Sequence, residues 1–457
     1  MKRTVVLNVV GLTPALLGEH TPNLNSFASR GAVRPLREVL PAVTCTAHAT
    51  FTTGLLPRDH GIVGNGWYFR DLAEVWLWRQ SDHLVQGDQV WDEARHRDSS
   101  FTCAKMFWWY NMYSSAELSV TPRPMYPADG RKLPDVYTEP PELREELARR
   151  FGTFPLFFFW GPNADIRSTR WIADASRHVY DSYRPTLTLV YLPHLDYGLQ
   201  RLGPNDPRLG KELREVDDVC GELIEHFERD GARVVVLSEY GVSEVDGVIH
   251  INRVLRKAGM VRVRDELGRD MLDAGASDAF AVADHQVAHV YVKRPERIAE
   301  VKALLERQEG VEVVLDAAGK ADHGLDHQRA GDLVAVSRAD RWFSYYFWLD
   351  DARAPDYART VDIHRKPGYD PVELFVDPEI KAPKLKIGIK LAKKKLGFRY
   401  LMDVIALDAG LVKGSHGRPS DEPHTGPLIM SNAPELLPEG EVAATSVREI
   451  MLQHLFE

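Results

Sequence analysis

The sequence contains few cysteines. Its 457 residues include only three, which are widely separated: Cys45, Cys103 and Cys220. Three scattered cysteines provide neither a disulfide framework nor the paired spacing of a structural zinc site. Because disulfide frameworks belong to oxidising compartments, their absence favours an intracellular protein, and we predict a cytoplasmic location.

The sequence also lacks an excess of positive charge and any long apolar run. Its 57 Lys and Arg residues are outnumbered by 66 Asp and Glu residues, and a formal charge of -9 gives no overall basic field to attract a nucleic-acid backbone. The first apolar stretch, residues 4–10, is about half the length of a membrane span and has no small-residue cleavage site behind it. No other segment reaches the roughly 18 apolar residues of a spanning helix, so we expect no membrane insertion.

What the sequence does contain is the alternation of apolar strands and amphipathic helices typical of an α/β protein. Residues 5–10, 187–192 and 233–238 are continuously apolar, as expected of parallel strands covered on both faces. Residues 207–230 carry apolar side chains at three- and four-residue steps, which predicts an amphipathic helix. The simplest architecture is a doubly wound, mostly parallel sheet.

After residue 258 the pattern changes to that of a small α+β unit. It predicts strands at residues 279–283, 287–292 and 311–315 and a helix at 295–308.

These changes in pattern suggest a division of the chain. We interpret residues 258–320 as an insert or cap on a catalytic α/β core formed by residues 1–257 and 321–457. A lysine-rich stretch within the second part of the core, residues 381–395, is expected to form a solvated helix face.

The segment 41–65 is the most informative part of the chain. A strand is expected to end near Val43, and a short helix to cover residues 45–53 and end at Gly54. Thr44 would then lie at the helix N-terminus, where unpaired N–H groups and the helix dipole favour an alkoxide or a phosphate oxygen. Threonine is also a common residue at a helix start for capping alone, so these residues by themselves leave both roles open.

Several motifs accompany this segment at characteristic spacings. They are Gly11-Leu12, Thr21-Pro22-Asn23-Leu24, Ala28-Ser29-Arg30-Gly31 and His60-Gly61-Ile62-Val63-Gly64-Asn65. Together they resemble the type I phosphodiesterase and nucleotide pyrophosphatase branch of the alkaline phosphatase superfamily. The resemblance implies an alkaline phosphatase-like fold and phosphoester or phosphodiester hydrolysis, with Thr44 as nucleophile and Asn65 supporting the transferred phosphoryl group.

Two later motifs resemble metal-binding loops of the same family. Asp196 follows the strand at 187–192, and His416 lies in Gly414-Ser415-His416-Gly417. In the family, two zinc-type ions clamp the phosphate and lower the pKa of the threonine hydroxyl. The resemblance therefore implies a divalent metal cofactor, one or two ions with zinc as the first choice and manganese, iron or magnesium left open.

Other ligand positions of the family are changed in this chain. Val10 stands at the position of the first-strand aspartate, and Gln200 at that of a histidine. Glu239-Tyr240 stands where the family has an Asp-His pair. Glu239 replaces one carboxylate by another and is predicted to bind metal, whereas three ligands have no obvious equivalent.

The segment 361–371 offers substitutes for the missing ligands. If it is extended, Asp362 and His364 project to the same side and are predicted as additional metal ligands. Arg365 and Lys366 beside them are candidates for binding the substrate phosphate. An ordinary surface loop with an Asp-Arg pair explains the same residues equally well.

Other histidines and aromatic residues have mainly structural interpretations. His48, on the helix that follows Thr44, and the insert residues Asp284, His285 and His289 are expected to be packing residues. The aromatic residues in three further segments are as suited to a core or a subunit interface as to a wall for a nucleobase or an apolar group: 106–113, 154–160 and 342–348.

The leading hypothesis is a metal-dependent hydrolase of a small phosphate ester that uses Thr44. Its first alternative is a catalytically inactive relative that serves as a binding or scaffold module. Its second is a transferase that passes the phosphoryl group from Thr44 to an acceptor other than water. No nucleic-acid backbone is expected as a partner, and the sequence leaves the oligomeric state open, including a homo-oligomer.

Overall fold

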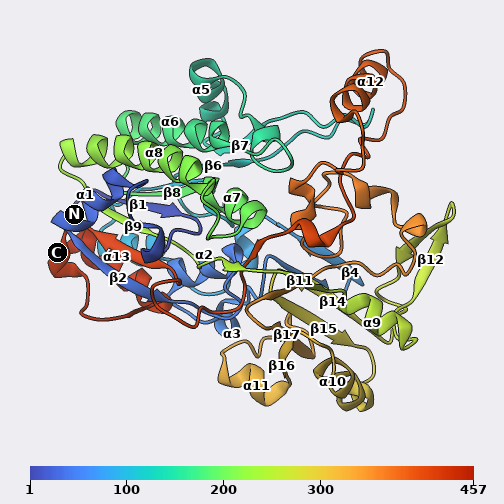
Figure 1. Ribbon diagram of the computed structural model, residues 1–457. Helices are drawn as coiled ribbons and strands as arrows, with labels where there is room; N and C mark the ends of the chain where they lie inside the picture. The colour runs from blue at the N-terminus through green and yellow to red at the C-terminus, as the bar shows by residue number, and fades with distance from the viewer.

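A nine-stranded sheet forms the larger part of the protein, which a computed structural model describes over residues 1–457 (Figure 1). Its strands are β1 (Thr4–Val9), β2 (Ala32–Arg37), β5 (Cys103–Met106), β6 (Leu118–Pro122), β7 (Val136–Glu139), β8 (Leu187–Leu192), β9 (Arg233–Leu237), β20 (Leu428–Ser431) and β21 (Val442–Ala443), in the order β21-β2-β20-β9-β1-β8-β5-β6-β7. β1 pairs in parallel with β8 and β9, and β5 with β8 and β6. β7 and β20 run antiparallel to their neighbours.

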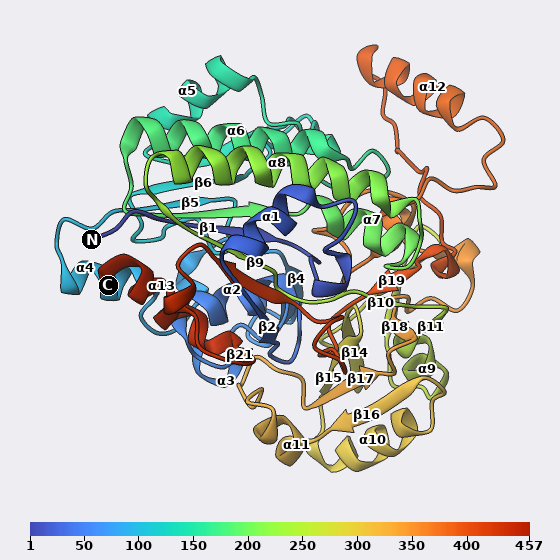
Figure 2. The same cartoon turned by 60° about the vertical axis from the view of Figure 1, so that its left-hand side comes forward.

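Helices cover both faces of this sheet (Figure 2). One face carries α1 (Pro22–Arg30), α5 (Glu142–Phe151), α6 (Ile166–Tyr183), α7 (His194–Leu202) and α8 (Leu209–Arg229), and the other carries α2 (Thr44–Thr53), α4 (Val90–Arg97) and α13 (Val447–Phe456). Successive side chains of β1 point to opposite faces of the sheet. Val5 and Leu7 belong to the hydrophobic core on the face covered by α8, and Val6 belongs to the core on the face covered by α2. The predicted doubly wound α/β class is therefore confirmed, as are the predicted strand at 187–192 and the helix that becomes α8.

A four-stranded antiparallel sheet forms a second, smaller part. It consists of β14 (Ala279–Asp284), β15 (Val287–Val292), β16 (Val311–Leu315) and β17 (Leu333–Ser337), in the order β14-β15-β17-β16, with α10 (Ile298–Glu306) and α11 (Ala317–Asp322) against it. The strands and the helix predicted for the insert are confirmed. The sheet takes one strand, β17, from beyond residue 320, and the proposed boundaries 1–257, 258–320 and 321–457 stay predictions.

Short elements complete the fold around the two sheets. They are the pairs β3 (Gly66–Phe69) with β4 (Glu74–Leu77), β10 (Ser243–Glu244) with β19 (Gly414–Ser415), β11 (Gly247–Ile249) with β18 (Arg341–Phe343) and β12 (Val263–Glu266) with β13 (Arg269–Leu272), and the helices α3 (Pro57–His60) and α9 (Ile251–Lys257). The pairing of β10 with β19 matters for the candidate site, because it brings His416 next to the segment that follows β9.

The lysine-rich stretch forms α12 (Pro383–Lys395), which stands away from both sheets in Figures 1 and 2. None of its residues is buried. Among all helices of the protein, none combines the length and the apolar character needed to cross a bilayer.

Candidate active site

Thr44 lies where the parallel strands of the large sheet end. It is the first residue of α2, which ends at Gly54 with a φ of 70°, as predicted. Asp196 is in the first turn of α7, just after β8, and Glu239 follows β9. The carboxyl ends of parallel strands are where α/β folds usually assemble their sites, so strand order alone brings these three residues together.

The hydroxyl of Thr44 is held by a carboxylate. Thr44 Oγ1 donates a hydrogen bond of 2.7 Å to Glu239 Oε2 and lies 3.3 Å from the phenolic oxygen of Tyr240. The side chains are deeply placed, with Thr44 3% and Glu239 2% exposed. A buried carboxylate that accepts a hydroxyl proton is the arrangement expected of a general base beside a nucleophile.

The other carboxylate oxygen of Glu239 is held by two donors. Asn8 Nδ2 and His48 Nε2 each lie 2.5 Å from Glu239 Oε1. The backbone N–H of Trp109 donates to His48 Nδ1 over 3.0 Å, which leaves the ring proton on Nε2, directed at the carboxylate. His48 also stacks on Trp108 at 4.2 Å, but the expectation that it serves packing alone is wrong.

Asp196 occupies the neighbouring part of the site. Its Oδ2 accepts a hydrogen bond of 2.7 Å from Gln200 Nε2, one helical turn further on. The Tyr240 hydroxyl lies 3.4 Å from its Oδ1 and so stands between Asp196 and Thr44. Burial, together with the nearby charge of Glu239, raises the pKa of Asp196 to about 7.

Four stacked rings, here called the ring column, fill the space beside Asp196. The ring centroids of Tyr240 and His416 lie 3.6 Å apart and those of His285 and Tyr369 3.7 Å apart, both pairs being stacked. The centroids of His416 and His285 lie 3.6 Å apart with the rings tilted by 37°. Tyr369 closes the column by donating to Gln200 Oε1 over 3.0 Å. His416 Nδ1 donates to the carbonyl of Ala42 over 2.8 Å, and burial lowers the pKa of His416 to about 3. The column is therefore built of neutral rings.

Asn65 is fixed beside the start of α2. Its Oδ1 accepts the backbone N–H of Cys45 over 3.0 Å. Its own N–H and Nδ2 donate to the two carboxylate oxygens of Asp284 over 2.7 and 3.0 Å. Burial raises the pKa of Asp284 to about 6. Through Asp284 the smaller sheet thus positions Asn65, a role that the structural interpretation of Asp284 did not foresee.

The predicted substitute ligands lie in a different setting. The segment 361–371 forms turns, so the expectation of an extended segment with Asp362 and His364 on one side is wrong. Asp362 pairs with Arg365 at 3.2 Å, and both Arg365 and His364 are exposed. Lys366 is buried and its charge is already balanced by two carboxylates, Asp370 at 2.6 Å and Glu373 at 2.7 Å. The residue of this segment that reaches the site is Tyr369, in the ring column.

The donor groups do not fit the predicted metal centre. No three side chains of the types His, Cys, Asp and Glu lie close enough together to hold an ion. Glu239 is engaged by Thr44, Asn8 and His48, and His416 is stacked between two rings, with its Nε2 4.0 Å from Asp196 Oδ1. Asp362 and His364 supply no replacement. The assignment of Asp196, Glu239 and His416 as metal ligands stays a prediction, and aromatic packing beside them occupies positions where a metal pair needs open ligands.

An aromatic wall borders the ring column. Trp78 and Trp160 have their rings 6.0 and 5.6 Å from that of Tyr369, and Trp109 lies 4.9 Å from Trp78. All three tryptophans are half-buried. Two of the aromatic segments singled out in the sequence therefore contribute to the site, whereas the third, residues 342–348, lies within the core of the smaller part.

Sequence reasoning did not predict that five side chains of the site contact one another or Glu239. They are Asn8, His48, Tyr240, His285 and Tyr369. The available signal was weak. His285 follows Asp284 at a strand end, and Tyr369 lies in the Pro-rich segment already selected for its ligands. Neither position indicates by itself that the two rings stack on each other.

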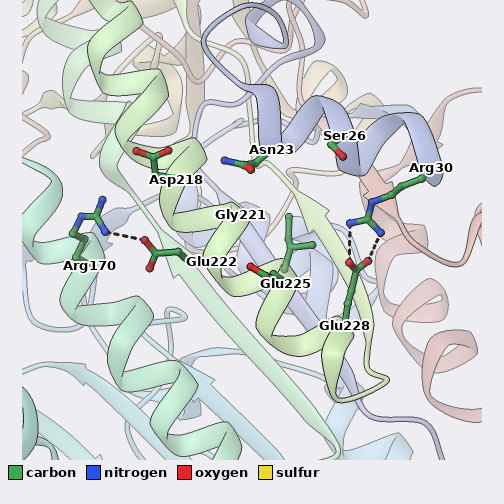
Figure 3. Close-up of a pocket in the computed structure, with 10 residues that line it drawn as sticks. Asn23, Ser26, Arg30, Arg170, Asp218, Gly221, Glu222, Glu225 and Glu228 are labelled. Atoms are coloured by element: carbon green, nitrogen blue, oxygen red, sulfur yellow. Dashed lines mark hydrogen bonds and ion pairs between the residues drawn. The ribbon is translucent and has the colours of Figure 1, made fainter.

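A separate hollow lies between α1, α6 and α8 (Figure 3). Its two arginines are paired, Arg30 with Glu228 at 2.7 and 2.8 Å and Arg170 with Glu222 at 3.4 Å. None of the residues around Thr44 lines it. This hollow is a salt-bridged groove on one helical face and is distinct from the candidate site.

Comparisons with known proteins agree with the geometry. The family model described as type I phosphodiesterase/nucleotide pyrophosphatase matches residues 4–370. A Schizosaccharomyces pombe protein described as an uncharacterized pyrophosphatase/phosphodiesterase is 27% identical over 234 residues, which are 49% of this chain and 41% of that protein. The match therefore spans well under half of that relative.

Solved structures show the same fold. Murine ectonucleotide pyrophosphatase/phosphodiesterase 5, in an inactive form with AMP, has a TM-score of 0.60 at 14% identity, covering 100% of this chain and 95% of that one. Phosphonoacetate hydrolase from Sinorhizobium meliloti 1021, in complex with phosphonoformate, has a TM-score of 0.62 at 16% identity, covering 99% and 96%. At sequence identities this low, the structural similarity supports the fold alone.

Proposed function

Because the chain belongs to the type I phosphodiesterase/nucleotide pyrophosphatase family, we propose that it hydrolyses a small phosphate ester or phosphodiester with Thr44 as the nucleophile. The observation that carries this proposal is the 2.7 Å hydrogen bond from Thr44 Oγ1 to Glu239 Oε2 at the start of α2. The family typically depends on divalent metals, but the residues of this site do not fit a metal pair, and in this proposal the chain's own groups move the protons.

In the first step Thr44 Oγ1 attacks phosphorus and Glu239 accepts its proton. The bond from phosphorus to the leaving oxygen breaks, and that oxygen takes the proton from Glu239. In the second step Glu239 takes a proton from water, whose oxygen attacks the phosphothreonine ester, and Thr44 recovers its proton as the phosphorus–Oγ1 bond breaks. No other reactant is needed, and an alcohol in place of water would make the same step a transfer.

Neighbouring groups have supporting roles in this proposal. The Tyr240 hydroxyl, 3.3 Å from Thr44 Oγ1, is placed to donate to a phosphoryl oxygen. Asn65 keeps the first turn of α2 in place through the N–H of Cys45. The tryptophans of the aromatic wall suit a substrate with a flat or apolar leaving group.

A binding module without turnover is the second candidate, and one observation favours it. Thr44 is only 3% exposed, which limits how closely a substrate can approach its hydroxyl. In that case the protein would bind a phosphate ester and leave it unchanged.

Thr44→Ala tests the proposal against this second candidate. Turnover of an aryl phosphodiester should fall by at least about 10³-fold, because the nucleophile is lost. Thr46→Ala is the matched control, since Thr46 is a buried threonine of the same helix whose hydroxyl has no hydrogen-bond partner. Wild-type turnover in Thr44→Ala removes Thr44 from the mechanism, and a wild-type protein that binds the ester without cleaving it establishes the binding module.

A further inference from the structure

α12 and the residues after it form a basic and apolar projection, here called the α12 arm (residues 381–401). The arm leaves the body of the protein and returns to it, and Figures 1 and 2 both show α12 apart from the two sheets. Its exposure, together with the absence of any buried residue in the helix, means that most of the large side chains of the arm do not serve the protein's own core, Ile387 being the exception.

The arm carries charge of one sign. Residues 381–401 include seven lysines and one arginine and no Asp or Glu, in a chain whose formal charge is -9. Lys386 and Lys390 pair with Asp403, which fixes the helix against the returning chain. The remaining cations make no ion pair: Lys381, Lys384, Lys393, Lys394, Lys395 and Arg399.

The same arm exposes large apolar side chains. Leu385, Ile389 and Leu396 recur at helical spacing on one face of α12 and are 64%, 52% and 72% exposed. Phe398 is 65% exposed, and with Ile389 and Leu396 it lines one shallow hollow. Exposing apolar side chains of this size to water costs free energy. Their grouping therefore indicates a surface that binds an apolar partner.

The orientation of the helix keeps this face free. Ile387 lies on the opposite side of α12 and packs against the core of the smaller part. The face with Leu385, Ile389 and Leu396 is therefore directed away from the protein.

We propose that the α12 arm binds the surface of an anionic lipid bilayer. The aliphatic side chains would enter the boundary between headgroups and acyl chains, and the unpaired lysines would lie at the level of the lipid phosphates. The helix has 13 residues, too few to span a bilayer, and so it lies in the plane of the surface. A nucleic-acid backbone would pair with the lysines but leave the leucine, isoleucine and phenylalanine side chains in water. An anionic bilayer pairs with the lysines and also buries these apolar side chains.

Co-sedimentation of the full-length protein with vesicles tests this assignment. The protein should bind vesicles that contain phosphatidylglycerol and not vesicles of phosphatidylcholine alone. The triple variant Lys393→Gln, Lys394→Gln, Lys395→Gln should lower the partition coefficient by at least about tenfold. The double variant Leu396→Asp, Phe398→Asp should lower it by at least about tenfold through lost insertion.

A matched control removes three positive charges from α8 instead, with Lys211→Gln, Arg214→Gln and Arg229→Gln. This control should bind as the wild type does, and all variants should keep its melting temperature, since none of the changed residues is buried. Equal loss in the control, equal binding to both kinds of vesicle, or tighter binding to a single- or double-stranded oligonucleotide than to anionic vesicles would overturn the proposal. Loss in only the charge variant would reduce the arm to an electrostatic patch and overturn the insertion step.

Discussion

The two halves of the candidate site differ in what fills them. Around Thr44 the side chains are polar and joined by hydrogen bonds, from Thr44 through Glu239 to His48. Around Asp196 and His416 the space is taken by the ring column, which is held by ring contacts and by hydrogen bonds from Tyr369 to Gln200 and from His416 to the carbonyl of Ala42. The difference teaches that one edge of the sheet can hold a hydrogen-bonded polar group and an aromatic group side by side, with the Tyr240 hydroxyl between Thr44 and Asp196.

Glu239→Gln should give the largest effect. The amide cannot accept the threonine proton, so kcat should fall about 10³-fold, equivalent to roughly 4 kcal/mol in the barrier. Steady-state hydrolysis of an aryl phosphodiester measures it, with Glu244→Gln, an exposed carboxylate on β10, as control. A kcat within about threefold of the wild type would show that the carboxylate is not the base.

Tyr369→Ala probes the ring column. Removing this buried ring leaves a cavity beside His285 and frees the amide of Gln200, so the free energy of unfolding should fall by about 3–5 kcal/mol. Tyr369→Phe keeps the stacking and loses one hydrogen bond, at a cost of about 1 kcal/mol. Urea unfolding of both variants separates the contribution of the ring from that of its hydrogen bond. Equal losses of unfolding free energy in the two variants would mean that stacking contributes nothing.

Asp284→Asn probes the polar half through pH. Burial raises the pKa of Asp284 from 3.8 to about 6, so the folded state binds a proton that the unfolded state releases between these values. The stability of the wild type should therefore fall relative to the variant as the pH rises from 4 to 6, by up to about 3 kcal/mol. Unfolding curves at several pH values test the sign, and parallel pH profiles of the two proteins would contradict it.

His48→Phe tests whether His48 positions Glu239. The variant keeps a ring against Trp108 but loses the Nε2 donor, which should lower kcat about tenfold. Because that donor holds the carboxylate toward Thr44, its loss should lower kcat while KM stays within about twofold of the wild type. A purely structural role would lower the free energy of unfolding and leave kcat unchanged.

Chelator treatment should have the smallest effect. Since the ring column takes the place of metal ligands, hydrolysis should persist after dialysis against EDTA, and added zinc or manganese should change kcat by less than about twofold. Complete loss on chelation, with recovery on adding one metal, would show that the two halves of the site are not as different as their contacts indicate.

Local patterns were enough to predict the framework of the site. Backbone and burial preferences within a few residues account for three predicted features. They are the apolar strand at 187–192, the three- and four-residue spacing of apolar side chains in α8, and the end of α2 at Gly54. They place Thr44, Asp196 and Glu239 at one edge of the sheet. Local patterns could not predict the partners of Asp284, because Asn65 lies 219 residues away in the sequence.

The α/β class and the threonine at the start of a helix follow from the sequence alone, since both depend on periodicity and on nearest neighbours in the chain. The tertiary structure was needed to show that Glu239 accepts a hydrogen bond from Thr44 and that the rings of Tyr240, His416, His285 and Tyr369 pack on one another. Those contacts join four distant segments, and whether a buried histidine meets an ion or an aromatic ring depends on what the folded chain places beside it.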